Sequence, residues 1–236
     1  MQLLINKGGI PLFEIRELTL ASMALRIFIA VLLGGALGLD RGLKNRPAGL
    51  RTYMLVCLGA CIVMITNQFV YQAYGTGDPV RMGAQVISGI GFLGAGTIIV
   101  TIRNQIKGLT TAAGLWASAC VGLAIGIGLY ETAILGGASV IFVLTVLQKW
   151  DYAMRQKARF IDVYIEMEKN SKLVHFVHGL RQENIEMSNL QIEREAGADN
   201  EIVAFIVTLK GEKHSNHNEM LSIVKNISEV AYVEEL

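Results

Sequence analysis

The sequence GGALGLDRGLKNRPAGLR, at residues 34–51, decides how the rest of the chain is read. An apolar run ends at Asp40, and apolar sequence resumes near residue 50 without a long linker. Four cations follow the aspartate within a dozen residues, at Arg41, Lys44, Arg46 and Arg51. Cations in a short loop between spanning helices are held on the cytoplasmic side of a membrane. The stretch therefore predicts a membrane hairpin that turns at the cytoplasmic surface. Pro47, which lacks an N–H, suits the start of the second helix.

The loop has two interpretations that its residues leave open. In the first, the cations only set the topology of the membrane segments. In the second, the loop is an interaction site, because a carboxylate stands beside Arg41 among small residues. These small residues are Gly34, Gly35, Gly38 and Gly49.

Composition divides the chain in two. Of its 236 residues, 52% are hydrophobic and only 17% are charged, with a mean hydropathy of +0.44. That is too apolar for one ordinary soluble domain, and the charges become dense only after Trp150. We expect a membrane domain at 1–150, a basic linker at 151–159 and a soluble domain at 160–236. No block of basic and aromatic residues indicates nucleic-acid binding.

Five apolar segments are long enough to cross a bilayer. They lie at about 21–39, 50–71, 82–101 and 108–128, with a fifth that follows a turn at 129–132 and ends near Gln148. Every expected inner loop is basic, which places the N-terminus outside and the C-terminal domain in the cytoplasm. Residues 1–20 suit a short helix on the outer surface, and we expect Arg26 to extend toward the lipid headgroups there.

The third apolar segment, AQVISGIGFLGAGTIIV, is rich in small residues. Its glycines are Gly89, Gly91, Gly94 and Gly96. Small residues mark close helix contacts in lipid, so packing is the favoured interpretation. The alternative is a locally broken helix whose backbone lines an ion or ligand path, with Gln85, Ser88 and Thr97 as its polar lining.

The segment at 160–236 alternates strand-like and helix-like stretches in the order βαββαβ, which is typical of a ferredoxin-like domain. It also holds all four histidines, His175, His178, His214 and His217, as two pairs spaced by three. Such a pair can bind a transition metal on one helix face. Neither pair has a cysteine or a convergent carboxylate nearby, so we favour solvated or half-packed histidines and assign no metal site.

The residue patterns do not predict an enzyme or a bound cofactor. No nucleophile stands with a base, and GIGFLG matches a dinucleotide fingerprint in letters only, because it lies within a spanning segment. Cys57, Cys61 and Cys120 all fall in apolar segments without metal-ligand spacing, so we expect small buried side chains.

Three motifs in the membrane half resemble the MgtC/SapB family. They are GGALGLDRGLKNRPAGLRTYMLVCLGA at 34–60, AQVISGIGFLGAGTI at 84–98 and IKGLTTAAGLWASACVGLAIGIG at 106–128. The resemblance implies a bacterial inner-membrane protein with five spanning helices and a cytoplasmic domain similar to the ACT fold. Its signature positions, by resemblance, are Asp40, Arg41, Arg46, Pro47, Arg51, Gln85, Ser88 and Gly89.

The resemblance implies two functions that disagree. Family members carry the label of Mg²⁺ transporters, yet they also resemble regulators needed for growth at low Mg²⁺ and for virulence, in part by restraining the F-type ATP synthase. As a regulator, the protein is expected to lie in the lipid bilayer. Its expected partners are a second copy of the chain, an ATP synthase subunit or a small membrane peptide.

We rank transport of Mg²⁺ or another cation second. Mg²⁺ usually requires one or two carboxylates, and the segments offer none at mid-bilayer. Arg41 beside Asp40 also weakens that aspartate as a cation ligand.

Overall fold

The computed structural model describes residues 16–44, 46–75, 77–101, 105–155, 159–168, 173–193, 202–211, 217–227 and 229–235. The chain forms two compact units, Met1–Gln148 and Lys149–Leu236. The first half of the expected linker at 151–159 is helical, because a helix continues to Arg155. The surface helix expected at 1–20 lies almost wholly outside the described residues, which begin at Arg16.

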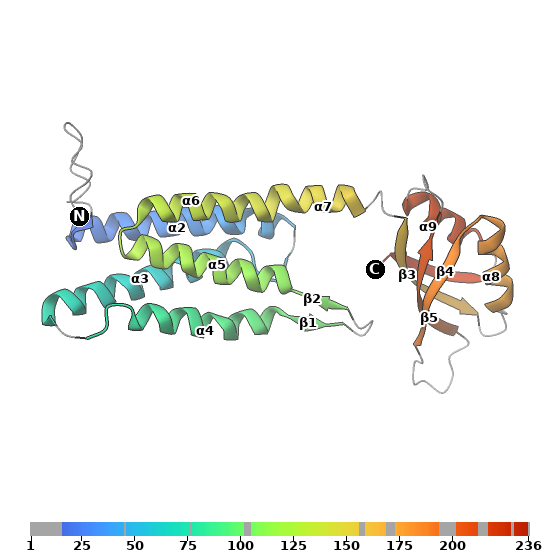
Figure 1. Ribbon diagram of the computed structural model, residues 1–236, viewed down its shortest axis with the longest axis horizontal. Helices are drawn as coiled ribbons and strands as arrows, with labels where there is room; N and C mark the ends of the chain where they lie inside the picture. The colour runs from blue at the N-terminus through green and yellow to red at the C-terminus, as the bar shows by residue number, and fades with distance from the viewer. Residues whose placement is uncertain are drawn as a thin grey trace. The chain divides into compact units, whose positions relative to one another are not determined.

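The first unit is a bundle of helices that run alongside one another (Figure 1). They are α2 (Leu20–Leu43), α3 (Leu50–Tyr74), α4 (Arg81–Thr97), α5 (Leu109–Gly126) and α6 (Tyr130–Phe142), which continues as the π-helix η1 (Val143–Leu147). Helix α7 (Gln148–Arg155) follows η1 directly, and all of it after Gln148 belongs to the second unit. Helix α5 contacts α2, α3, α4 and α6, so it is the central helix of the bundle.

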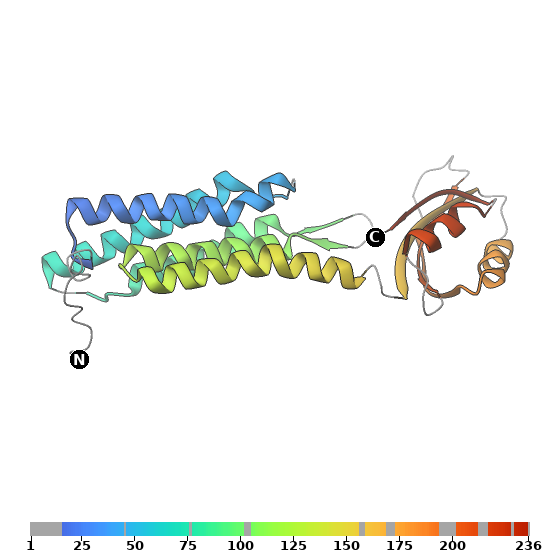
Figure 2. The same ribbon diagram turned by 90° about the horizontal axis from the view of Figure 1, so that it is seen from above.

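Four helices of the described chain are long and apolar enough to cross a membrane: α2, α3, α5 and the helical segment at Tyr130–Met154. The expected third segment is shorter than predicted, because α4 ends at Thr97 and not near residue 101. Ile98 adopts an extended backbone there, and β1 (Ile99–Val100) pairs antiparallel with β2 (Ile106–Lys107). This two-stranded ribbon extends from the ends of α4 and α5 in both views (Figures 1 and 2).

Local sequence explains where the long helices begin and end. Helix α2 begins with a capping box between Thr19 and Ser22. Helix α3 begins at Leu50 after Gly49, so Pro47 lies in the preceding loop and not in the first turn. It ends at Gly75, whose φ of +62° is a left-handed conformation that favours glycine.

Small residues on α5 bring it close to α3. A Cβ atom on Gly122 would lie 2.2 Å from the Cys57 carbonyl oxygen, and the Ser118 hydroxyl donates to the Tyr53 carbonyl at 3.2 Å. Cys57 and Cys61 are free and buried in this interface. The absence of a side chain at Gly122 therefore allows α5 to approach the backbone of α3 closely.

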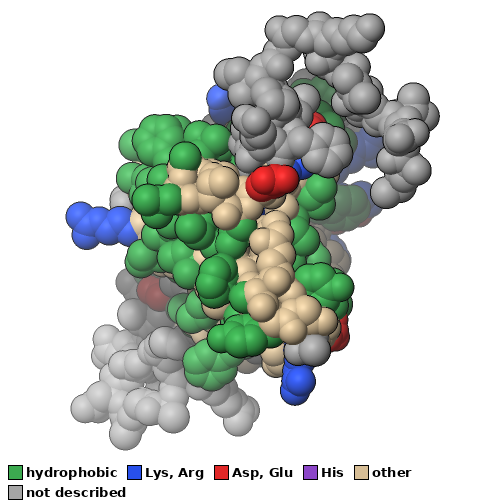
Figure 3. Space-filling view, turned by 90° about the vertical axis from the view of Figure 1, so that its left-hand side faces the viewer, with side chains coloured by type: hydrophobic (Ala, Val, Ile, Leu, Met, Phe, Trp, Pro, Cys, Tyr) green, Lys and Arg blue, Asp and Glu red, His purple; other side chains and the backbone are tan. Residues whose placement is uncertain are grey.

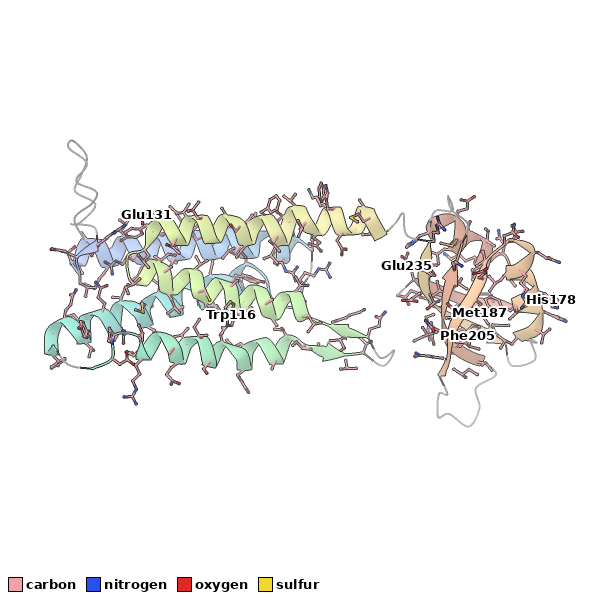
Figure 4. The ribbon with its side chains drawn as sticks, viewed as in Figure 1. Trp116, Glu131, His178, Met187, Phe205 and Glu235 are labelled. Carbon is pink, nitrogen blue, oxygen red and sulfur yellow. The ribbon has the colours of Figure 1, made fainter. Side chains whose placement is uncertain are left out.

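The second unit is a four-stranded sheet with two helices. Its elements are β3 (Phe160–Glu168), α8 (Leu173–Gln182), β4 (Glu186–Glu193), β5 (Ile202–Lys210), α9 (His217–Lys225) and β6 (Val230–Glu235). They follow one another in the predicted order, and the strands lie in the order β4-β5-β3-β6 with every neighbouring pair antiparallel. Alternate residues of the central strands, such as Val163 and Phe205, pack against Phe176 of α8 and Met220 of α9 (Figure 4).

Candidate functional site

Two arginines, Arg26 and Arg41, are the only charged side chains buried in the described part of the membrane unit. Their residue exposures are 0% and 3%. Both belong to α2, where fifteen residues of helix place them about 22 Å apart along the axis. They mark two ends of the bundle, which we call the Arg26 end and the Arg41 end.

At the Arg26 end, the guanidinium group is surrounded by oxygen atoms from several elements. It donates to Gln68 Oε1 at 2.7 Å, to the Gly126 carbonyl at 2.8 Å and to the Arg16 carbonyl at 2.7 Å, and its Nε lies 3.4 Å from the Tyr130 hydroxyl. Gly126 is the last residue of α5, where the helix dipole is negative. Arg26 therefore joins α2 to α3, α5 and the start of α6.

The expectation that Arg26 extends toward lipid headgroups is wrong. The turn between α5 and α6 packs against it, and Gly128 in that turn has a φ of +84°. A Cβ atom at Gly128 would lie 3.2 Å from Arg26 Nη2. The side chain is enclosed because Gln68 and the carbonyls of Gly126 and Arg16 supply the acceptors that headgroups or water would otherwise provide.

At the Arg41 end, the second guanidinium has far fewer partners. Arg41 Nη2 donates to Thr111 Oγ1 at 2.7 Å, whereas the buried Nε has no hydrogen-bond partner among the described residues. The neighbouring carboxylate of Asp40 instead lies 2.8 Å from Lys44 Nζ. No ion pair joins Arg41 to a carboxylate in the part of the chain that the structure describes.

Tyr53 completes this group of side chains. It is fully buried, and its hydroxyl interacts with the Arg41 guanidinium, although no bond of good geometry reaches that oxygen from any described residue. Gly114 of α5 makes room for it, since a Cβ atom there would lie 2.2 Å from the Tyr53 hydroxyl oxygen. Tyr53, Thr111 and Gly114 were missed by sequence reasoning, because each reads as an ordinary residue of an apolar helix.

The structure brings only part of the expected loop site together. Arg41 is buried and Asp40 half-buried, while Arg46, Pro47 and Arg51 are exposed. The expected site residues of the third segment are well separated from this loop. Gln85, Ser88 and Gly89 are exposed on α4.

Helix α4 is unbroken, so the alternative of a broken helix lining a path is not found. Gln85 and Ser88 face away from the bundle, and neither forms a hydrogen bond within the described residues. Of the predicted packing glycines, Gly94 would place a Cβ atom 3.4 Å from the Ala112 Cβ, whereas Gly91 and Gly96 have open space around them.

Two histidines of the second unit lie beside carboxylates, and no group of three or more potential metal ligands occurs among the described residues. His217 is buried, with Nδ1 2.9 Å from Glu235 Oε1. His175 Nδ1 lies 3.6 Å from Glu229 Oε1, at a cleft of about 510 Å³ that His178 of α8 also lines (Figure 4). His214 lies outside the described residues.

Comparison with known proteins identifies the family. The model of the MgtC family matches residues 27–152, which is more than half of the chain and includes Arg41, Tyr53 and Thr111. This chain belongs to the MgtC family. Four apolar helices together with this membership indicate a bacterial membrane protein.

Several relatives of this MgtC family member match half of the chain or more. The "Putative magnesium transporter YhiD" of Escherichia coli K12 is 32% identical over 89% of this chain and 96% of its own length. "Protein SapB" of Bacillus subtilis 168 is 32% identical over 72% and 76% of the two chains. "Protein MgtC" of Brucella abortus 2308 is 44% identical over 50% and 48%. No solved structure gives a significant match.

Proposed function

We propose that this MgtC family member is a regulator in the bacterial inner membrane that supports adaptation to low Mg²⁺ by binding other proteins within the bilayer. The observation that carries the proposal is the uncovered polar face of α4. Restraint of the F-type ATP synthase and a part in virulence extend the proposal on the family resemblance alone.

In this proposal α4 is a fifth spanning helix. Its 17 residues rise about 26 Å, at the lower limit of the length that crosses a bilayer. The Arg41 end carries the exposed cations Lys44, Arg46, Arg51 and Lys107, and is assigned to the cytoplasm by the charge rule. The opposite end shows mainly uncharged side chains among its described residues (Figure 3), which supports the proposal that this end faces the outside.

The face of α4 that would meet lipid carries hydrogen-bonding groups. Gln85 and Ser88 are exposed there, and Gly89 and Gly96 have no heavy atom within 4 Å of a Cβ position. Polar side chains left without a partner in hydrocarbon are unfavourable, and small residues allow another helix to approach closely. A partner helix would supply both contacts. The partners we propose are a small membrane peptide, an ATP synthase subunit or a second copy of the chain.

The second unit supports a regulatory role. The succession βαββαβ with strand order β4-β5-β3-β6 is the arrangement expected of a ferredoxin-like domain, and we propose that it is an ACT-like domain on the cytoplasmic side.

Transport of Mg²⁺ is the second candidate, favoured by the printed name of the E. coli relative. The bundle interior argues against it. Its buried charges within the described residues are two arginines, and a cation would meet both without a buried carboxylate to bind it.

Photo-cross-linking tests the proposal. A photoreactive amino acid at Ser88 should give a cross-linked product of discrete mass in intact cells, because a partner covers that face. The matched control is Ser139 on α6, which is also exposed but donates to its own helix at the Leu135 carbonyl, 2.8 Å away. Equal products at both positions, or none at Ser88, would contradict a partner on α4.

A further inference from the structure

The two buried arginines differ in how many hydrogen-bond acceptors surround their guanidinium groups. A guanidinium has five N–H donors and stays charged in proteins. Arg26 meets oxygen atoms of four other residues, whereas Arg41 has one short bond, to the Thr111 hydroxyl. A buried charge without a counter-charge is strongly unfavourable. The Arg41 end therefore lacks an acceptor that the Arg26 end has.

A second buried donor at the same place lacks an acceptor as well. The Tyr53 hydroxyl is adjacent to the Arg41 guanidinium and, like Arg41 Nε, has no hydrogen-bond partner among the described residues. A guanidinium only donates, so an oxygen acceptor placed between the two would satisfy both groups. Because the buried guanidinium carries a charge without a carboxylate partner among the described residues, an anionic acceptor suits the two groups best.

The backbone adds to this positive character. Tyr53 and Thr111 stand in the first turns of α3 and α5, whose N-caps are Gly49 and Gly108. Neither glycine provides a side-chain cap, so the first N–H groups of both helices keep their partial positive charge. Helix N-termini of this kind favour phosphate and other anions.

One carboxylate stands close by and has to be accounted for. Asp40 precedes Arg41, but its Oδ2 lies 2.8 Å from Lys44 Nζ, and that ammonium also donates to Gln148 Oε1 at 3.1 Å. The Asp40 carboxylate is therefore paired with a lysine, although its buried Oδ2 has no hydrogen bond of good geometry among the described residues. The surrounding exposed cations leave the net charge of this end positive.

From these contacts we infer that the Arg41 end binds a phosphate group, with Arg41 and Tyr53 as its buried donors. Phosphate offers several strong acceptor oxygens, which suits a planar guanidinium together with converging N–H and O–H groups. The group comes either from the headgroup of an anionic phospholipid or from free inorganic phosphate. Both have the same chemistry at this site.

The test uses purified full-length protein and two probes. Native mass spectrometry measures retention of phosphatidylglycerol relative to the neutral headgroup of phosphatidylcholine. Thermal unfolding measures whether inorganic phosphate raises the melting temperature above that in chloride of equal ionic strength, since a ligand of the folded state stabilises it. Preferential lipid retention identifies the headgroup, and a phosphate-dependent rise in melting temperature identifies the free ion.

The decisive variant is Tyr53→Phe. Because no hydrogen bond of good geometry joins the hydroxyl to a described residue, its removal should impair folding little. It should weaken binding of the effective probe about tenfold, the typical effect of one hydrogen bond to a charged group. Arg41→Lys keeps the charge but loses the planar fork and should also bind more weakly.

Arg51→Gln is the matched control, because it removes an exposed cation in the first turn of α3 without touching a buried donor. Binding in this variant should stay within about twofold of wild type. The inference is overturned if neither probe binds the wild-type protein selectively. It is also overturned if Tyr53→Phe binds as well as wild type, or if Arg51→Gln loses as much binding as Tyr53→Phe.

Discussion

Replacement of Arg26 by methionine should strongly destabilise the membrane unit. The substitution keeps most of the side-chain volume but removes the donors to Gln68, Gly126 and Arg16, which lie 2.7 to 2.8 Å away. Interhelical hydrogen bonds in membrane proteins contribute roughly 0.6 to 1.7 kcal/mol each. Three of them correspond to a loss of about 2 to 5 kcal/mol in the free energy of unfolding.

Arg16→Ala is the matched control for this prediction. It retains the backbone carbonyl that Arg26 binds and removes only the ion pair to Glu131, whose side chain is 57% exposed (Figure 4). Exposed ion pairs contribute at most about 1 kcal/mol. Reversible unfolding in mixed micelles, followed by tryptophan fluorescence, compares the two variants. Equal stability of Arg26→Met and Arg16→Ala would refute the assignment of Arg26 as the connection between four helices.

Two further perturbations test other parts of the structure. Gly122→Ala should cost about 1 to 3 kcal/mol by overpacking, because its Cβ atom would lie 2.2 Å from a backbone oxygen of α3. Gly59→Ala, with no heavy atom within 4 Å, should be neutral or gain up to about 1 kcal/mol in the same unfolding assay; the reverse ranking would contradict the packing of α3 on α5. In the second unit, the hydrogen bond from Lys210 and its positive charge lower the pKa of Glu186 below the ordinary value of 4.5. The pair therefore stabilises the folded state at pH values above 4.5, and this stabilisation is lost as the pH falls through the lowered pKa. An NMR titration should therefore give a higher pKa for Glu186 in Lys210→Gln than in wild type, and an unchanged pKa would show that the pair does not form in solution.

The order of helices and strands along the chain is largely predictable from its sequence, because it depends on segment length and on the local pattern of apolar and turn residues. Apolar runs long enough to span a membrane predicted the helices that the structure has at Leu20–Leu43 and Leu50–Tyr74. Strand-like and helix-like stretches separated by turn residues predicted the βαββαβ succession of the second unit. The end of α4 at Thr97 was not predictable in this way, because it depends on the pairing of Ile99 and Val100 with residues across a tight ribbon.

Which polar side chains are buried, and what they contact, depends on packing between segments that are far apart in the sequence. From the sequence, Arg26 is expected near a helix end, and no neighbouring residue indicates that Gly126 and Tyr130 lie beside it. The same holds for Arg41, which the motif places in a loop region but which is buried by Tyr53 and Thr111. Sequence indicated that the stretch at 34–51 is special, and only the packing of three helices shows which of its cations is enclosed.

The most direct test of the proposed function is Mg²⁺ flux into proteoliposomes that contain the purified full-length protein and a fluorescent Mg²⁺ reporter. We expect no entry above that of protein-free liposomes, for wild type and for Asp40→Ala alike, because the enclosed charges within the described bundle are both positive. Mg²⁺ entry that requires the protein and is abolished by Asp40→Ala would contradict this expectation and establish transport as the function.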